Sequence, residues 1–136
     1  VHRLQVHQCL HLIQQEYSRH NGNNGTVHPM IKCWFLIHHS QCPTFHTVII
    51  LQLKKDGYTI ASIEQTDSSV SLLDWDIKPD QKLAIVMGNE VDGVSDEALA
   101  LSDVAIEIPQ YGTKHSLNVS VCTGVVLWEV SRKLRS

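Results

Sequence analysis

Two short stretches of this 136-residue chain carry side chains that could bind a ligand or move a proton. In GNEVDG (88–93), Glu90 stands between two glycines, which allow backbone shapes and close ligand approach that other residues do not. Glu90 could position a ligand, or it could be a solvated residue of an ordinary turn. In PQYGTKHSLN (109–118), His115 could act as a general base, although no carboxylate lies near it in sequence to orient it.

The second stretch ends in Ser116 and Asn118. Ser116 can cap the helix that follows, and no GxSxG motif surrounds it to make it a nucleophile. Asn118 needs another explanation, because Asn is a mediocre helix former and is costly to bury without hydrogen-bond partners. It either hydrogen-bonds locally or serves a ligand.

The elements that must position these loops are visible in the second half of the chain. KLAIVMG (82–88) is a near-continuous apolar run, typical of a strand buried on both faces, and 58–64 and 104–108 also have strand patterns. Ser95 is placed to cap a short helix, and 116–135 is predicted as a final helix.

This order of elements predicts an α/β fold with a mostly parallel sheet and flanking helices. Ligands bind such sheets beyond the carboxyl ends of the strands. Because GNEVDG follows one strand and PQYGTKHSLN follows the next, both loops are expected at the same rim of the sheet. The pattern alone predicts a ligand site formed by two loops.

The final helix carries two apolar stripes. We expect the stripe Leu117, Val121, Val125 and Trp128 to bury one face. Beside it runs a second stripe, Val119, Cys122, Val126 and Val130, which is more than one core face requires and favours self-association.

The first 53 residues differ in composition from the rest. They hold eight of the nine histidines and three of the four cysteines but only four charged residues. His7 and His11 could share a helix face, yet no spacing matches a standard zinc site, so no metal is predicted. We therefore divide the domain into an atypical or truncated N-terminal segment, 1–53, and a main part, 54–136.

Three elements are expected in that segment. An amphipathic helix is predicted over 3–17 and a strand over 30–38, with NGNNG (21–25) as the loop between them. Residues 47–57 could form a strand, but Lys54 and Lys55 followed by Gly57 look like the end of a helix.

Bulk properties exclude several classes of protein. The net charge of -3 does not indicate a strong polyanion binder, so RNA binding would need a local patch. No apolar run approaches the roughly 20 residues of a membrane span. The four cysteines form no CxxC pair, which indicates free thiols and a reducing, cytoplasmic setting.

Two long motifs resemble those of a known family. IVMGNEVDGVS (85–95) and IEIPQYGTKHSLNVSVCTGVVLWE (106–129) resemble the second and third signature motifs of the SpoU/TrmH family, in the right order and with compatible spacing. This family of the SPOUT superfamily comprises S-adenosylmethionine-dependent ribose 2′-O-methyltransferases that act on tRNA or rRNA. The resemblance covers about residues 54–136.

The resemblance implies a C-terminal trefoil knot, S-adenosylmethionine held by the motif loops, an RNA substrate and a homodimer. By position, it implies a catalytic site shaped by Glu90, Ser116 and Asn118. It also implies donor-binding positions at Thr66, Gly88, Gly93, Ile108 and Leu117.

The family's first motif, an Asn followed by a helix that carries a catalytic Arg, is not recognisable before residue 54. That Arg is thought to promote deprotonation of the ribose hydroxyl. Its absence from the pattern leaves an alternative open, a non-catalytic protein that binds the donor or RNA.

Overall fold

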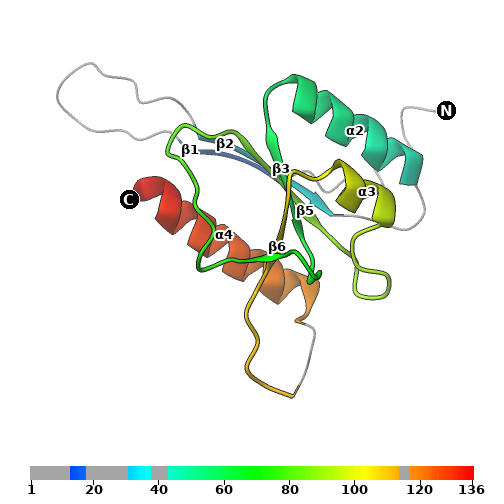
Figure 1. Cartoon of the computed structure of the whole chain (residues 1–136). Helices are drawn as coiled ribbons and strands as arrows, with labels where there is room; N and C mark the ends of the chain where they lie inside the picture. The colour runs from blue at the N-terminus through cyan, green and yellow to red at the C-terminus, as the bar shows by residue number, and fades with distance from the viewer. Residues whose placement is uncertain (1–12, 18–30, 38–42, 114–116) are drawn as a thin grey trace.

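The structure, a computed structural model, describes residues 13–17, 31–37, 43–113 and 117–136. Six strands and three helices lie in these ranges (Figure 1). In chain order they are β1 (Ile13–Tyr17), β2 (Ile31–Ile37), α2 (Pro43–Lys55), β3 (Thr59–Ile63), β4 (Val70–Ser71), β5 (Leu83–Met87), α3 (Asp96–Leu101), β6 (Val104–Glu107) and α4 (Val119–Arg135).

The strands form one sheet in the order β1-β2-β5-β3-β6-β4. Every neighbouring pair is parallel except β1 and β2, which run antiparallel. At the centre, Ile85 of β5 pairs with Phe35 of β2 on one side and with Ala61 of β3 on the other. The predicted α/β fold with a mostly parallel sheet is confirmed.

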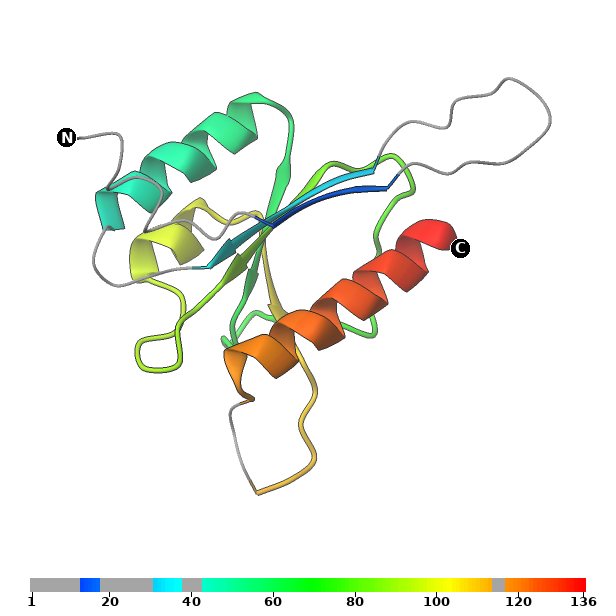
Figure 2. The ribbon, with the colours of Figure 1, turned by 180° about the vertical axis from the view of Figure 1, so that it is seen from behind.

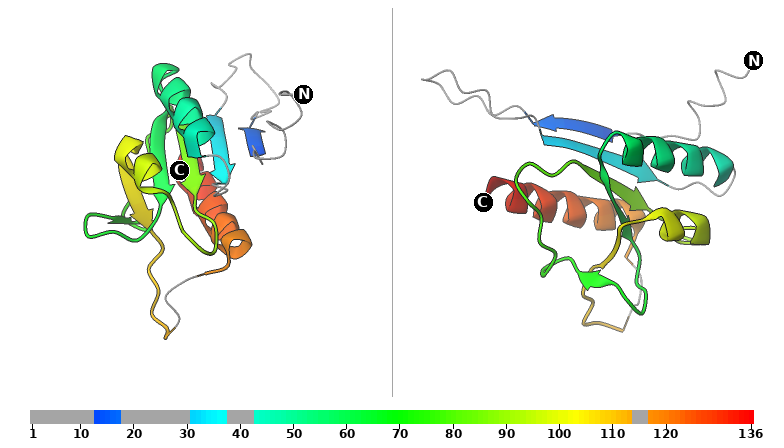
Figure 3. Two further views of the ribbon diagram at one scale, coloured as in Figure 1. Left: turned by 90° about the vertical axis from the view of Figure 1, so that its right-hand side faces the viewer. Right: turned by 45° about the horizontal axis from the view of Figure 1, so that its top comes forward.

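Helices cover both faces of this sheet, which explains why β5 is apolar at every position. Leu83, Ile85 and Met87 belong to a core closed by Val126 and Val130 of α4. Ala84 and Val86 belong to a second core, on the face that carries α2 and α3. Figure 2, seen from behind, and both views of Figure 3 show α4 on the side of the sheet away from α2 and α3.

The C-terminal half of α4 is attached to the chain segment that follows β4. Lys133 Nζ donates hydrogen bonds to the carbonyl oxygens of Leu73 and Trp75, each over 2.8 Å. The buried carboxylate of Glu129 accepts two hydrogen bonds from Arg132, over 2.9 and 2.7 Å. The two Lys133 bonds join residues 60 and 58 positions apart in the sequence, whereas Glu129 and Arg132 lie on adjacent turns of α4.

Three expectations about the N-terminal segment were tested by the described residues. The helix predicted over 3–17 is wrong at 13–17, because these residues form strand β1, which pairs with β2. In so polar a stretch, backbone pairing at the edge of the sheet outweighs the helical spacing of the few apolar residues. The strand predicted over 30–38 is confirmed, and the open question at 47–57 is resolved as helix α2. His7, His11 and the loop 21–25 lie outside the described residues.

The apolar stripes of α4 have the reverse arrangement from the one expected. Val126 and Val130 of the second stripe are buried against the sheet. In the first stripe Val121, Val125 and Trp128 are exposed, Trp128 by 74 %. Where a helix has two adjacent stripes, hydrophobicity alone does not decide which one meets the core.

The trefoil knot that the family resemblance implies stays a prediction. Within the described ranges, no helix combines the length and apolar character needed to cross a membrane.

Candidate functional site

A pocket of about 380 Å³ opens at the carboxyl ends of β3, β5 and β6, beside the first turn of α4. Both loops singled out from the sequence contribute to it, as the strand order predicted. Its lining residues are Ile63, Glu64, Gln65, Met87, Gly88, Asn89, Glu90, Gly93, Ile106, Glu107, Ile108, Gln110, Leu117, Asn118, Val119 and Cys122.

The loop after β5 turns back on itself so tightly that two positions require glycine. Gly93 has a φ of +66°, a backbone conformation that other residues rarely adopt. A Cβ at Gly88 would lie 2.5 Å from Val94 N and 2.6 Å from Gly93 Cα, closer than a Cβ approaches other heavy atoms in proteins. The side chain of Asn89 closes the turn, because its Oδ1 accepts hydrogen bonds from Val91 N (2.9 Å) and Asp92 N (2.7 Å).

Glu64 joins this loop to the end of β3. Its Oε2 accepts a hydrogen bond from Val94 N over 2.9 Å. The same oxygen would lie 2.5 Å from a Cβ at position 93, so the carboxylate occupies the space that a side chain at Gly93 would need. The second glycine and the carboxylate are therefore complementary parts of one wall of the pocket.

Asn118 is the N-cap of α4. Its Oδ1 accepts a hydrogen bond from Ser120 N over 2.9 Å, and its backbone carbonyl accepts the first helical bond, from Cys122 N over 2.8 Å. Asn is among the best N-cap residues, because its side chain satisfies an amide that the helix leaves unpaired. The helix therefore begins at Val119, and Asn118 has the capping role that the sequence analysis gave to Ser116.

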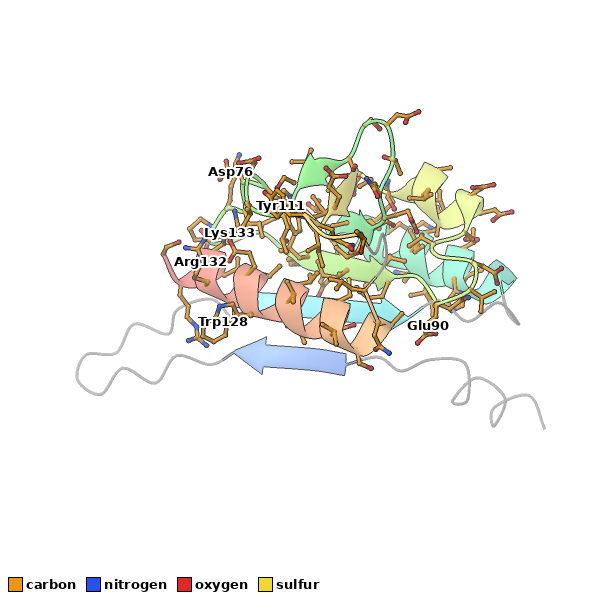
Figure 4. The ribbon with its side chains drawn as sticks, turned by 90° about the horizontal axis from the view of Figure 1, so that it is seen from below. Asp76, Glu90, Tyr111, Trp128, Arg132 and Lys133 are labelled. Atoms are coloured by element: carbon orange, nitrogen blue, oxygen red, sulfur yellow. The ribbon has the colours of Figure 1, made fainter. Side chains whose placement is uncertain are left out.

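The structure brings most of the predicted site residues together. Gly88, Glu90, Gly93, Ile108, Leu117 and Asn118 all line the pocket. Figure 4 shows that Glu90 and Tyr111 lie on two separate loops. Ser116, with Lys114 and His115, lies outside the described residues.

Thr66 is not among the lining residues. It belongs instead to a local turn with Ser69, whose Oγ lies 2.8 Å from Thr66 O and 3.0 Å from Glu107 Oε2. Glu107 itself lines the pocket, so Thr66 is connected to the site through two intervening side chains.

Sequence reasoning missed Glu107 and Cys122 as lining residues, and it included Glu64 only as part of a predicted donor loop over 64–66. Glu64 comes directly after strand β3 and Glu107 is the last residue of strand β6. Because ligands collect at the carboxyl ends of parallel strands, that position was the signal available for both. Cys122 had no such signal, since only the packing of α4 against the sheet brings it to the pocket.

The pocket is acidic. Glu64, Glu90 and Glu107 line it, while no Lys, Arg or His appears among the described residues of its wall. Burial raises the pKa of the Cys122 thiol, and the negative charge of Glu64 raises that pKa further. Together with apolar walls from Ile63, Ile106 and Ile108, this arrangement suits a ligand with an apolar body and a positive charge.

Comparisons with known proteins agree with this geometry. The model of the SpoU rRNA Methylase family matches residues 6–128. A tRNA (guanosine(18)-2′-O)-methyltransferase of Aquifex aeolicus is 40 % identical over 85 residues, which cover 62 % of this chain and 39 % of that protein. The chain thus spans about two fifths of the length of this relative.

Solved structures of RNA methyltransferases also resemble this chain. The crystal structure of the A. aeolicus TrmH/SpoU tRNA modifying enzyme has a TM-score of 0.60 at 28 % identity, covering 74 % of this chain and 60 % of the other. An AdoMet-bound rRNA methyltransferase from Sinorhizobium meliloti has a TM-score of 0.57 at 27 % identity, covering 66 % of this chain and 34 % of the other.

Proposed function

Because the chain belongs to the SpoU rRNA methylase family, we propose that it binds S-adenosylmethionine in the pocket described above and transfers its methyl group to a ribose 2′-hydroxyl of tRNA or rRNA. The observation that carries the proposal is the pocket itself, because both signature loops line it at the carboxyl ends of the strands. The family match and the donor-bound relative support it. We assign the reaction to the cytoplasm.

The residues present fit this donor. The volume of about 380 Å³ lies in the range of small-molecule sites. Apolar side chains such as Ile108 and Leu117 can cover an adenosine, and the carboxylates of the wall suit a cation. When bound, S-adenosylmethionine supplies a methyl group on a positively charged sulfur. We assign its binding to Gly88, Gly93, Ile108 and Leu117, with Thr66 acting through Ser69 and Glu107.

Glu90, Ser116 and Asn118 are proposed to shape the catalytic side of the pocket. The ribose oxygen gains the methyl group and loses its proton, so a proton acceptor must lie near it. Positioned acid–base help of this kind is typically worth about 10²–10⁴-fold in rate. Glu90 is the exposed carboxylate among the three that line the pocket, and it is therefore the one most accessible to an incoming RNA.

A direct test combines calorimetric titration of S-adenosylmethionine with transfer of labelled methyl groups to bulk tRNA and rRNA. We expect donor binding, with label recovered at a 2′-O-methylated nucleoside after RNA digestion. Donor binding without methyl transfer to either RNA would instead support the non-catalytic alternative. Absence of donor binding by the folded chain would refute the proposal.

We also propose a homodimer that forms through α4. The stripe Leu117, Val121, Val125 and Trp128 is exposed, and Trp128 projects on a different side of α4 from Lys133 (Figure 4). Contiguous exposed apolar surface of this kind marks association sites. Because Leu117 also lines the pocket, association would cover the stripe directly beside the donor site.

A further inference from the structure

Three contacts hold Glu64 in place inside the pocket. Its backbone N–H donates a hydrogen bond to Ile106 O of β6 over 3.0 Å. Its Oε2 accepts a hydrogen bond from Val94 N, and its carboxylate packs against Gly93. The side chain is half-buried. Its negative charge is therefore fixed at the wall of the pocket.

The charge of Glu64 is not balanced by any described side chain near it. Oε1 has no hydrogen bond within the described ranges, and the described wall of the pocket contains no basic residue. Glu90 and Glu107 add two further carboxylates to the same wall. An uncompensated carboxylate in a partly enclosed site near the protein surface attracts a cation more strongly than it would in bulk water.

We propose that the Glu64 carboxylate makes the pocket prefer the positively charged methyl donor over the uncharged thioether product. This inference rests on the proposed function. Methyl transfer removes the positive charge from sulfur and leaves the adenosine and the amino-acid end unchanged. The product therefore keeps the shape of the donor but loses its attraction to Glu64, which favours its release.

The preference for the charged donor should be measurable, because one charge–charge interaction can change a dissociation constant severalfold. Two unit charges several ångströms apart near a protein surface interact strongly enough to change affinity about tenfold after partial screening by solvent. We expect the dissociation constant of S-adenosylhomocysteine to exceed that of S-adenosylmethionine by about this factor in the unmodified chain.

Glu64→Gln separates the charge of this residue from its structural role. Glutamine keeps the size of the side chain and an oxygen that can accept the hydrogen bond from Val94 N, but it removes the charge. Glu97→Gln is the matched control, because Glu97 is an exposed acid of α3 outside the pocket and its replacement changes the net charge by the same amount.

The experiment is calorimetric titration of both variants and the unmodified chain with three ligands. These are S-adenosylmethionine, S-adenosylhomocysteine and sinefungin, in which an amine-bearing carbon replaces the sulfonium. Glu64→Gln should weaken binding of the two charged ligands about tenfold and leave S-adenosylhomocysteine unchanged. Glu97→Gln should change none of the three.

The outcomes separate this inference from the proposed function. If Glu64→Gln weakens the binding of all three ligands equally, Glu64 only supports the loop and the inference is wrong. If Glu64→Gln does not fold, the unmodified chain decides, because equal affinity for S-adenosylmethionine and S-adenosylhomocysteine overturns the inference alone. Failure of the folded, unmodified chain to bind any of the three ligands overturns the proposed function itself.

Discussion

Asn118 caps α4 through its side chain and also lines the pocket. Replacing Asn118 with Ala removes the acceptor for Ser120 N, so we expect unfolding free energy to fall by about 0.5–2 kcal/mol. Donor binding should weaken by roughly 1–3 kcal/mol, because the Ser120 amide in the first turn of α4, beside the pocket, loses its acceptor. Denaturant unfolding and calorimetric titration measure the two effects separately.

Asn118→Asp is the control for this pair of measurements. Aspartate keeps an oxygen that can cap the helix, so this variant should keep most of the unfolding free energy that Asn118→Ala loses. If Asn118→Ala binds S-adenosylmethionine like the unmodified chain, Asn118 is a cap only and has no role at the donor site.

Gly88 tests whether the shape of the loop is needed for donor binding. A methyl group at this position meets the backbone of Gly93 and Val94, which cannot move aside without opening the turn. Gly88→Ala should therefore abolish measurable donor binding, and it should lower stability by about 1–3 kcal/mol, as overpacking does.

Gly112→Ala is the matched control for Gly88→Ala. Gly112 lies on the neighbouring loop, and a Cβ there would meet no atom within 4 Å. Its replacement should leave donor binding and thermal stability unchanged. Equal affinity of the Gly88→Ala variant and the unmodified chain would mean that the loop does not hold the donor.

At the scale of elements, Lys133 attaches α4 to the segment after β4. Lys133→Met keeps the aliphatic stem but leaves the carbonyl oxygens of Leu73 and Trp75 without their donor. We expect a loss of about 1–3 kcal/mol in unfolding free energy. Lys55→Met, at the exposed end of α2, should have little effect. If Lys133→Met and Lys55→Met unfold at the same denaturant concentration, the hydrogen bonds of Lys133 do not stabilise the fold.

The pair of Glu129 and Arg132 predicts a dependence of stability on pH. The hydrogen bonds and charge of Arg132, with the charge of Lys133, hold the pKa of Glu129 below its ordinary value, although burial acts in the opposite direction. Because the folded-state pKa is lowered, the stabilisation is present above the unfolded pKa, near pH 4, and is lost as pH falls through the folded value.

Thermal unfolding of Glu129→Gln and the unmodified chain between about pH 3 and pH 7 measures this contribution. The difference between their midpoints should be constant near neutral pH and shrink towards the acidic end. A difference that stays the same across the whole range would show that the charge of Glu129 does not stabilise the fold. Glu97→Gln, which removes an exposed carboxylate, should follow the unmodified chain.

Much of the α/β core was predictable from sequence because local pattern and burial agree there. β5 is apolar at all five positions and is buried at all five. Ser95 caps α3 as expected, with its side chain accepting a hydrogen bond from Ala98 N. β4, by contrast, has only two residues, which is too short for any periodicity to indicate a strand.

The site was less predictable than the core because its parts meet only through the fold. The motif loops were recognisable, but Cys122 reaches the pocket only because Val126 and Val130 pack on the sheet. The pattern of α4 did not reveal this choice of face. In the same way, Thr66 follows strand β3 closely in sequence, yet it bonds with Ser69 in a local turn and does not line the pocket.

For the whole molecule, the proposed dimer predicts that a charge on the exposed stripe of α4 separates the subunits. Val121 on α4 and Val48 on α2 form a matched pair, because they are exposed by 54 % and 59 % and lie on helices that cover opposite faces of the sheet. Val121→Glu should give a monomer by light scattering at micromolar concentration, while Val48→Glu should remain a dimer. An unmodified chain that scatters as a monomer would refute the dimer.

The central place of β5 has a consequence for how the chain is synthesised. β2 and β3 both leave the ribosome before β5, yet in the finished sheet each of them pairs with β5 and not with the other. Until β5 emerges, both strands expose unpaired backbone groups that can join other nascent chains. At about 5–20 residues per second, the roughly 20 residues between β3 and β5 take about 1–4 s to translate. Codons that slow translation in this interval should therefore increase aggregation, whereas equally slow codons placed after β6, the last strand of the sheet, should not.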